Sequence, residues 1–479
     1  MNKIKTLAGE TMLYGLGSML PRILNFLLVP LHTITMFSRD EYGQITKLLS
    51  VVAFVNVVYM FGMETAFFRF STKPLADTKK IFNLAQTCVL AISISLSVIF
   101  IVFSGTIASA LGFAKHPEFI RWMTLVMLID ASVAIPFAQL RLQKKALLFA
   151  TAKIANVLLL IGLNFYFLKI NYDPAVGIGY VFLATLLANA IFILFFLKTL
   201  VQWRPAWDRI ISMEMLHYAY PVMLMGVAGM TNEMFSRLTL DWWLPEYYYG
   251  VVSNKEALGI FGACYKFAVF MNLGIQAFRY AAEPFFFSHS TDKNSPALFA
   301  KANHYFIIAG CFVLLAVTIN LDILKYFVGK EFWDGLPIVP ILLLAYLCLG
   351  IYYNVSIWFK LTDKTYVGTL ITLGGAAVTI LANYYLIPLW GYTGSSWAAL
   401  LCYGGMAIAC YVLGQNYFPV PYKVGRGLAY IAFAFSLIQI STLLNPVNQL
   451  AASAIHVFLL LLFVGIAYWQ ERKYWNEPA

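Results

Sequence analysis

The sequence predicts an all-α integral membrane protein with about 14 transmembrane helices, and three observations lead to this fold class. Of its 479 residues, 61% are hydrophobic and only 11% are charged, whereas an ordinary soluble domain has about 45–50% apolar and about 25% charged residues. The apolar residues form continuous runs and do not alternate with polar ones, which excludes a β-barrel. The net charge of +11 lies mostly in short loops between these runs. The composition therefore excludes a soluble enzyme, a nucleic-acid-binding protein and a disordered chain.

Apolar runs of about 20 residues, the length that crosses the hydrocarbon core, predict each helix in order. The predicted spans are residues 11–35, 44–68, 82–112, 119–140, 146–168, 176–200, 215–236, 258–284, 303–328, 335–359, 366–388, 393–415, 425–444 and 449–470. The six cysteines all lie within these runs, and none has metal-ligand or disulfide spacing. We therefore interpret the cysteines as packing residues.

Lys and Arg residues in the loops predict the orientation, because cytoplasmic loops carry more of them. With the N-terminus inside, the inside segments hold 20 of the 33 Lys and Arg residues and the outside segments hold 7. Both termini are therefore expected in the cytoplasm. No loop is large, and the longest outer segment is residues 237–257.

An internal repeat predicts how the spans are grouped. At an offset of 219 residues, Lys47 aligns with Lys266 and Glu64 with Glu283. An offset of 204 residues aligns the first span with the seventh. A repeat of six spans is even-numbered and hence parallel, as in some alternating-access transporters. We expect two six-helix lobes around a central cavity, then two additional helices and a cytoplasmic tail, at residues 1–209, 210–417 and 418–479.

Ionisable residues inside spans supply the candidate site, because a charge in the bilayer is costly and normally faces a bundle interior or a wet cavity. The basic ones are candidates for binding an anionic substrate: Lys47, Lys153, Lys266 and Arg279. The acidic ones are candidates for ion coupling: Asp130, Glu64, Glu233 and Glu283. For those near span ends, structural ion pairs or snorkelling side chains are the alternative interpretation.

Arg22 differs from the other basic residues because it lies near the middle of the first span, too deep to snorkel easily. It shares one helix face with residues at steps of three, four or seven, namely Thr11, Gly15, Ser18, Asn25 and His32. Pro21 and Pro30 can bend this helix and free backbone carbonyls. We therefore expect a cavity-lining face with Arg22 at its centre, and Ser18 and Asn25 as neighbouring substrate-binding residues.

Two further features each allow two interpretations. Asp130, near the middle of the fourth span, either pairs with Arg22 or Lys153 or carries a proton or cation. The outer loop 241–249, with the sequence DWWLPEYYY, is rich in aromatic residues. Trp and Tyr collect at membrane interfaces, which favours a simple interfacial belt. A platform on which sugar rings stack is the functional alternative.

The sequence resembles a known family in several of these features. They are the fourteen spans, the arginine in the first span, and the stretches 62–70 (GMETAFFRF) and 279–287 (RYAAEPFFF). Together they are similar to the Wzx-type polysaccharide exporters of bacteria. These proteins are lipid-linked oligosaccharide flippases of the multidrug/oligosaccharidyl-lipid/polysaccharide exporter superfamily. The resemblance extends over essentially the whole chain.

The resemblance implies a multi-pass protein of the bacterial cytoplasmic (inner) membrane with a cationic cavity between two lobes. Its implied activity is to flip undecaprenyl-pyrophosphate-linked oligosaccharide repeat units, precursors of O-antigen, capsule or exopolysaccharide, from the cytoplasmic to the periplasmic face. The implied partners are this lipid-linked substrate, membrane lipid and a polysaccharide polymerase. We expect a monomer that uses no cofactor or metal other than a coupling ion, H⁺ or Na⁺.

The chemistry of the candidate residues agrees with this implied activity. A pyrophosphate is polyanionic, and arginine offers a planar, always-charged fork that matches phosphate oxygens. No covalent step is needed, so we expect a transporter and not an enzyme. Three alternatives stay open: a lipid II flippase, which also has fourteen spans, a cation-coupled multidrug exporter, and a polysaccharide polymerase or ligase. An exporter of cationic drugs would be expected to carry a carboxylate where Arg22 stands, and the short outer loops argue against a polymerase.

Overall fold

The computed structural model describes residues 15, 17, 19–288, 294–444 and 448–475. Over these residues the chain is helical throughout and forms no β-strand, apart from one isolated bridge between Tyr249 and Val252. Packing divides it into two compact units, Met1–Leu238 (unit 1) and Thr239–Ala479 (unit 2). The predicted all-α membrane fold is confirmed.

Unit 1 begins with a helical stretch at residues 19–26 and continues through short and long helices in sequence. They are α2 (Leu28–Pro30), the π-helix η1 (Leu31–Met36), α3 (Arg39–Met60), α4 (Met63–Ser71), α5 (Thr78–Val102), α6 (Ser104–Leu111), α7 (Pro117–Leu142), α8 (Ala146–Phe165), the π-helix η2 (Tyr166–Ile170), α9 (Gly179–Phe195), α10 (Leu197–Gln202) and α11 (Arg209–Trp243), whose last residues belong to unit 2.

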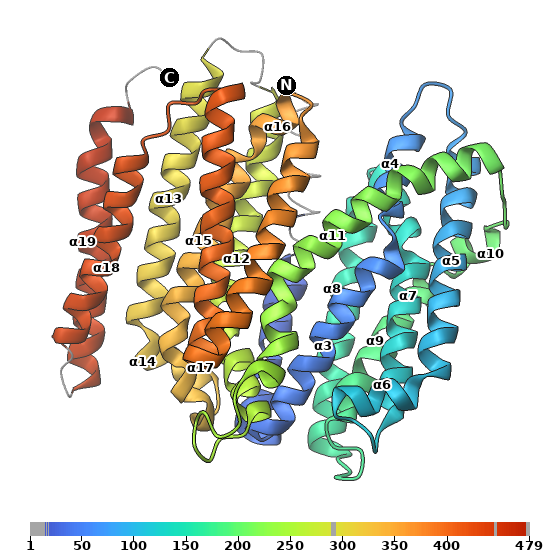
Figure 1. The fold of residues 1–479 in the computed structure, drawn as a ribbon, viewed down its shortest axis with the longest axis horizontal. Helices are drawn as coiled ribbons and strands as arrows, with labels where there is room; N and C mark the ends of the chain where they lie inside the picture. Colours follow the sequence, from blue (N-terminus) through green and yellow to red (C-terminus); the bar gives the residue numbers. More distant parts are fainter. Residues whose placement is uncertain (1–14, 16, 18, 289–293, 445–447, 476–479) are drawn as a thin grey trace. The chain divides into compact units, whose positions relative to one another are not determined.

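Unit 2 holds the remaining helices, several of which run side by side (Figure 1). They are α12 (Asn254–Ser288), α13 (Ser295–Ile319), α14 (Leu321–Leu324), the 3₁₀ helices η3 (Lys325–Phe327) and η4 (Lys330–Ile338), α15 (Val339–Val355), α16 (Ile357–Leu361), α17 (Thr365–Tyr417), α18 (Val424–Leu443) and α19 (Gln449–Trp475).

Twelve helices within the described residues are long and apolar enough to cross a membrane, against the 14 spans predicted. One difference is α9, which has only 17 residues and occupies the predicted sixth span. The other is α17, whose 53 residues contain both the predicted 366–388 and 393–415. A straight helix of 53 residues would be about 80 Å long, more than twice the hydrocarbon thickness, but α17 consists of two helices joined at a non-helical residue. Gly391, at φ 56° and ψ −136°, turns the chain inside it.

The core of unit 1 shows why the predicted second span is broken into two helices. Phe61 and Gly62 both have positive φ between α3 and α4. A Cβ on Gly62 would lie 2.6 Å from the carbonyl oxygen of Ala219 on α11, so only glycine permits this close approach. Beside the break, Met63 and Ala219 belong to one buried apolar cluster.

The first half of α11 therefore packs within unit 1, and the boundary between the units falls inside this helix at residue 238. The predicted lobes begin instead at residue 210. The division into lobes at 1–209, 210–417 and 418–479, and the cavity between them, remain predictions. Within unit 2, α15 packs on α17, and both α18 and α19 pack on α13.

Candidate functional site

Arg22 lies in the helical stretch 19–26, and its side chain is exposed, as is that of Asn25. No hydrogen bond or ion pair joins Arg22 to another residue in the described part of the chain. Ser18, the third predicted member of this face, lies outside the described residues. Arg22 lies near the middle of the predicted span 11–35, and a charge at such a depth is tolerated only where it meets water or polar groups. The position thus fits a residue that meets an anionic ligand.

Asp130 lies at the centre of a polar cluster in unit 1. Its carboxylate accepts a hydrogen bond from Asn189 Nδ2 on α9 at 3.0 Å, and Asn189 Oδ1 accepts one from Asn156 Nδ2 on α8 at 2.9 Å. Asn56 on α3 also hydrogen-bonds to Asp130, and the Lys153 ammonium on α8 interacts with it electrostatically. Four helices thus converge on one carboxylate, with Lys153 and not Arg22 as its countercharge.

The Lys153 ammonium lies among aromatic rings on its other side. Its Nζ is 4.3 Å from the centroid of the Phe137 ring and 4.8 Å from that of Phe192. Such cation–π contacts stabilise an ammonium that is removed from water. Lys153 is half-buried, and its ammonium interacts both with Asp130 and with the Phe137 and Phe192 rings. This arrangement suits a fixed internal cation better than a direct substrate contact.

The other basic candidates also have partners. Lys47 on α3 is buried and Lys266 on α12 is half-buried, and each interacts with other groups of the chain. Arg279 on α12 lies with its guanidinium carbon 4.1 Å from the centroid of the Tyr353 ring on α15. The structure therefore places two of these cations in unit 2 and one in unit 1.

The acidic candidates differ in environment. Glu64 on α4 forms an ion pair with Arg141 on α7, which favours a structural role. Glu233 on α11 is half-buried, and its backbone carbonyl accepts a hydrogen bond from Arg237 NH2 at 3.3 Å. The side chain of Glu283 lies outside the described part of the chain. Of the three whose side chains are described, Asp130 is the one that belongs to the amide-rich cluster described above.

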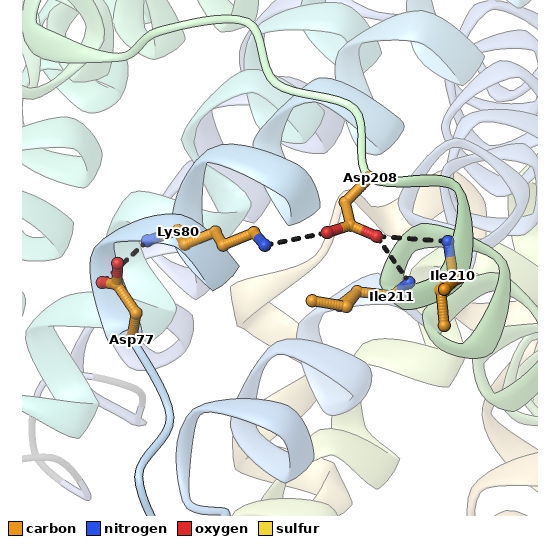
Figure 2. Close-up of polar contacts among 5 residues, drawn as sticks. All are labelled: Asp77, Lys80, Asp208, Ile210 and Ile211. Carbon is orange, nitrogen blue, oxygen red and sulfur yellow. Dashed lines mark hydrogen bonds and ion pairs between the residues drawn. The ribbon is translucent and has the colours of Figure 1, made fainter.

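A cluster that sequence reasoning missed anchors the segment between α10 and α11 (Figure 2). Asp208 accepts hydrogen bonds from the backbone amides of Ile210 and Ile211, both at 3.2 Å, and so caps α11. Its other oxygen lies 2.8 Å from Lys80 Nζ on α5. The hydrogen bond from Lys80 is the main reason that the pKa of Asp208 lies below its ordinary value. Asp77 in turn caps α5 by accepting from the Lys80 backbone amide at 3.1 Å.

The aromatic outer loop is partly used for packing within unit 2. The rings of Tyr249 and Tyr392 stack with centroids 4.6 Å apart, and Tyr249 Oη accepts a hydrogen bond from the Tyr392 amide at 3.1 Å. Burial raises the pKa of Tyr249. Tyr248 donates to the Leu389 carbonyl at 2.7 Å. Tyr247, 82% exposed, and Trp242, 57% exposed, present the largest exposed fractions of the loop's described aromatic side chains and are the candidates for sugar stacking.

Twelve long apolar helices among the described residues define the class of protein as a multi-pass membrane protein. A model of the family described as "Polysaccharide biosynthesis protein" matches residues 36–293, and the chain belongs to this family. No curated protein matches the chain significantly. Within the described residues, no group of three or more His, Cys, Asp or Glu side chains is placed to hold a metal ion.

Solved structures of transporters share the fold. The lipid II flippase MurJ in an inward closed conformation matches with a TM-score of 0.74 at 13% identity, over 96% of this chain and 99% of its own. An inward-facing MATE-family multidrug resistance transporter of the MOP superfamily matches with a TM-score of 0.62 at 14% identity, over 88% of this chain and 95% of its own. The MATE multidrug transporter DinF-BH matches with a TM-score of 0.58 at 15% identity, over 86% of this chain and 95% of its own. These likenesses show that a chain of the polysaccharide biosynthesis family has the fold of these membrane proteins.

Proposed function

We propose that the protein flips undecaprenyl-pyrophosphate-linked oligosaccharide repeat units from the cytoplasmic to the periplasmic face of the bacterial inner membrane. Both termini lie in the cytoplasm, and transport proceeds by alternating access without a covalent step. The observation that carries the proposal is the exposed Arg22 near the middle of the first span, in a chain of the polysaccharide biosynthesis family. Lys47, Lys266 and Arg279 are the candidates for further contacts with the pyrophosphate.

Electrostatics explains why arginine suits this task. A pyrophosphate must cross about 30 Å of hydrocarbon, where its charge has no water to solvate it. The guanidinium offers two parallel N–H donors to phosphate oxygens and keeps its charge at any physiological pH. Asn25, exposed on the same helix, can donate a further hydrogen bond. The prenyl chain stays in the lipid while the head group crosses.

Asp130 carries the coupling ion in this proposal, and that ion is a proton. Its carboxylate already has an internal countercharge in Lys153 and amide donors from Asn189 and Asn56. A sodium ion would have to displace the tethered ammonium or bring a second positive charge beside it. A proton neutralises the carboxylate and releases Lys153 without needing a coordination shell.

A lipid II flippase is the second candidate, and the match to MurJ over nearly the whole of both chains favours keeping it. Both substrates would present the same undecaprenyl pyrophosphate. Purified protein in liposomes can be tested with three substrates: a lipid-linked oligosaccharide, lipid II and a cationic dye. We expect fast flipping of the oligosaccharide lipid only. Equal or faster flipping of lipid II would replace the proposal by the second candidate, and transport of the dye alone would refute both.

A further inference from the structure

A pocket of about 250 Å³ lies in unit 2 among α13, α15, α17 and α18, and it opens to the outside, where Ile408 and Leu428 of its lining are exposed. Its walls are almost entirely apolar, with Ile307, Ile351, Ile408 and Ile431 contributing from the four helices. Of the helices around the pocket, α18 packs on α13 and α15 packs on α17. It is distinct from every candidate site residue discussed above.

Small residues on α17 keep this space open. Gly404 lines the pocket, and a Cβ built on it would have no described atom within 4 Å. Ala407, one turn further along, lines the same wall. A bulkier side chain at either position would enter the pocket without disturbing the backbone.

The pocket is too apolar to hold ordered water, because such a water needs two to four polar partners. An engineered apolar cavity of only about 150 Å³ stays dry and binds benzene. In a membrane, the abundant apolar molecule of suitable shape is the acyl chain of a lipid.

Charge at the pocket identifies the head group of that lipid. Lys423, which lines the pocket, is exposed and directly precedes the first turn of α18. Arg426 follows on α18, and Lys301 lies near the start of α13. All three fall in segments that the loop charges assign to the cytoplasmic side. Basic pockets between helices on this side of a membrane are suited to anionic lipid head groups.

We propose that this pocket binds one acyl chain of an anionic phospholipid from the cytoplasmic leaflet, with the lipid phosphate at Lys423. The occupant fills the space beside α18 and so supports the attachment of α18 and α19 to α13. His304 connects the pocket to α19, because it lines the pocket and its Nε2 lies 2.9 Å from Glu471 Oε1 on α19. This site is separate from transport, and its test does not depend on the substrate proposed above.

The test is a titration of the purified, delipidated full chain with phosphatidylglycerol, followed by native mass spectrometry. Gly404→Phe fills the pocket, and Gly405→Phe is its matched control. Gly405 is the exposed neighbour on the same helix and does not line the pocket. Each buried CH₂ contributes about a fourfold factor in affinity, so displacing three or four lowers binding on the order of 100-fold. We expect this loss for Gly404→Phe and wild-type binding for Gly405→Phe.

Lys423→Gln tests the head group and changes no packing in the pocket. A basic residue near a lipid surface contributes about a fivefold factor, so phosphatidylglycerol should bind about fivefold more weakly. Phosphatidylcholine of the same chain length should lose less, because its choline group offsets the charge of its phosphate. Inorganic phosphate should not compete with the lipid. The proposal is overturned if Gly404→Phe binds phosphatidylglycerol like the wild type, if phosphatidylcholine binds equally well, or if undecaprenyl phosphate displaces phosphatidylglycerol at lower concentration.

Discussion

At the scale of single residues, Arg22 and Asp130 have contrasting surroundings. Arg22 is exposed and bonds to no other described residue, whereas Asp130 is held by side chains from three further helices. A cation that has no partner among the described residues suits a ligand that arrives and leaves. A carboxylate with an internal countercharge suits a group that changes only its protonation.

Arg22→Ala should lower the affinity for the lipid-linked oligosaccharide about 10–100-fold, because a charge-assisted hydrogen bond contributes roughly 1.5–3 kcal/mol. Arg22→Lys should recover only part of this loss, since lysine keeps the charge but lacks the planar fork. Binding of a fluorescent lipid-linked oligosaccharide to purified protein measures both effects. Normal binding by Arg22→Ala would remove Arg22 from the site.

Asp130→Asn should abolish the dependence of flipping on a proton gradient, because the amide cannot be protonated within the physiological range. The assay compares flipping rates in liposomes with and without an imposed pH difference. Asp173→Asn is the control, because Asp173 is an exposed loop carboxylate that accepts only the Ala175 amide at 2.9 Å among the described groups. Full gradient dependence in Asp130→Asn would make Asp130 a structural residue.

At the scale of elements, the segment before α11 is tied to α5 by several bonds along its length. Besides the Lys80–Asp208 ion pair, the Ala206 amide donates to Thr87 Oγ1 at 3.1 Å and the Arg204 amide to Asn83 Oδ1 at 3.4 Å. Both α5 and α11 thus begin with an aspartate cap at the same edge of unit 1. These contacts fix the start of α11 relative to α5.

The Asp208 contacts should make this edge sensitive to acid. Because the folded pKa of Asp208 lies below its ordinary 3.8, its stabilising contribution is present above that pH and is lost as the pH falls through the folded pKa. Asp208→Asn should therefore melt at a lower temperature than the wild type at pH 6, and the difference should shrink below pH 3.8. A difference that is constant across this range would contradict the assignment. Lys80→Met should reproduce part of the loss.

The last helix is held by a buried polar network that links α13, α18 and α19. Glu471 Oε1 lies 2.9 Å from His304 Nε2 and accepts a hydrogen bond from Tyr430 Oη at 3.0 Å, with His304 and Glu471 both only 5% exposed. Buried polar groups of this kind are costly to leave without partners. The network thus fixes the register of α19 against its neighbours.

Removing Glu471 should be more costly than removing the Tyr430 hydroxyl. Tyr430→Phe should lower the free energy of unfolding by about 1 kcal/mol, and Glu471→Leu by about 1–3 kcal/mol, since the latter leaves two buried groups without their partner. Thermal melting in detergent measures both. Tyr366→Phe, which removes an exposed hydroxyl on α17, should be neutral. Equal melting temperatures for all three variants would show that the network contributes nothing.

At the scale of the whole molecule, the sequence predicted well what depends on local composition. Apolar runs gave the spans because hydrophobic length is a property of consecutive residues. The sequence was less informative where the backbone changes direction within an apolar run. The two predicted spans inside α17 are joined through Gly391, whose turn is stabilised by Tyr249 from 143 positions away. The break at Gly62 likewise depends on a distant contact with Ala219.

The candidate site was predictable only in part for the same reason. Charged residues inside spans are conspicuous, and Asp130 and Lys153 were both identified. The amides around Asp130 were not, because uncharged Asn residues are common and Asn189 lies 59 positions from Asp130 in the chain. The Lys80–Asp208 pair is 128 positions apart. No local pattern pairs residues at such separations.

The most direct test of the central claim is the rate at which purified protein flips a fluorescent undecaprenyl-pyrophosphate-linked oligosaccharide in sealed liposomes. The label is quenched from outside, so the accessible fraction reports movement between leaflets. The account predicts fast flipping by the wild type, severely reduced flipping by Arg22→Ala despite equal reconstitution, and none in liposomes without protein. Flipping by the wild type no faster than in protein-free liposomes would contradict it, and so would equal rates for the wild type and Arg22→Ala.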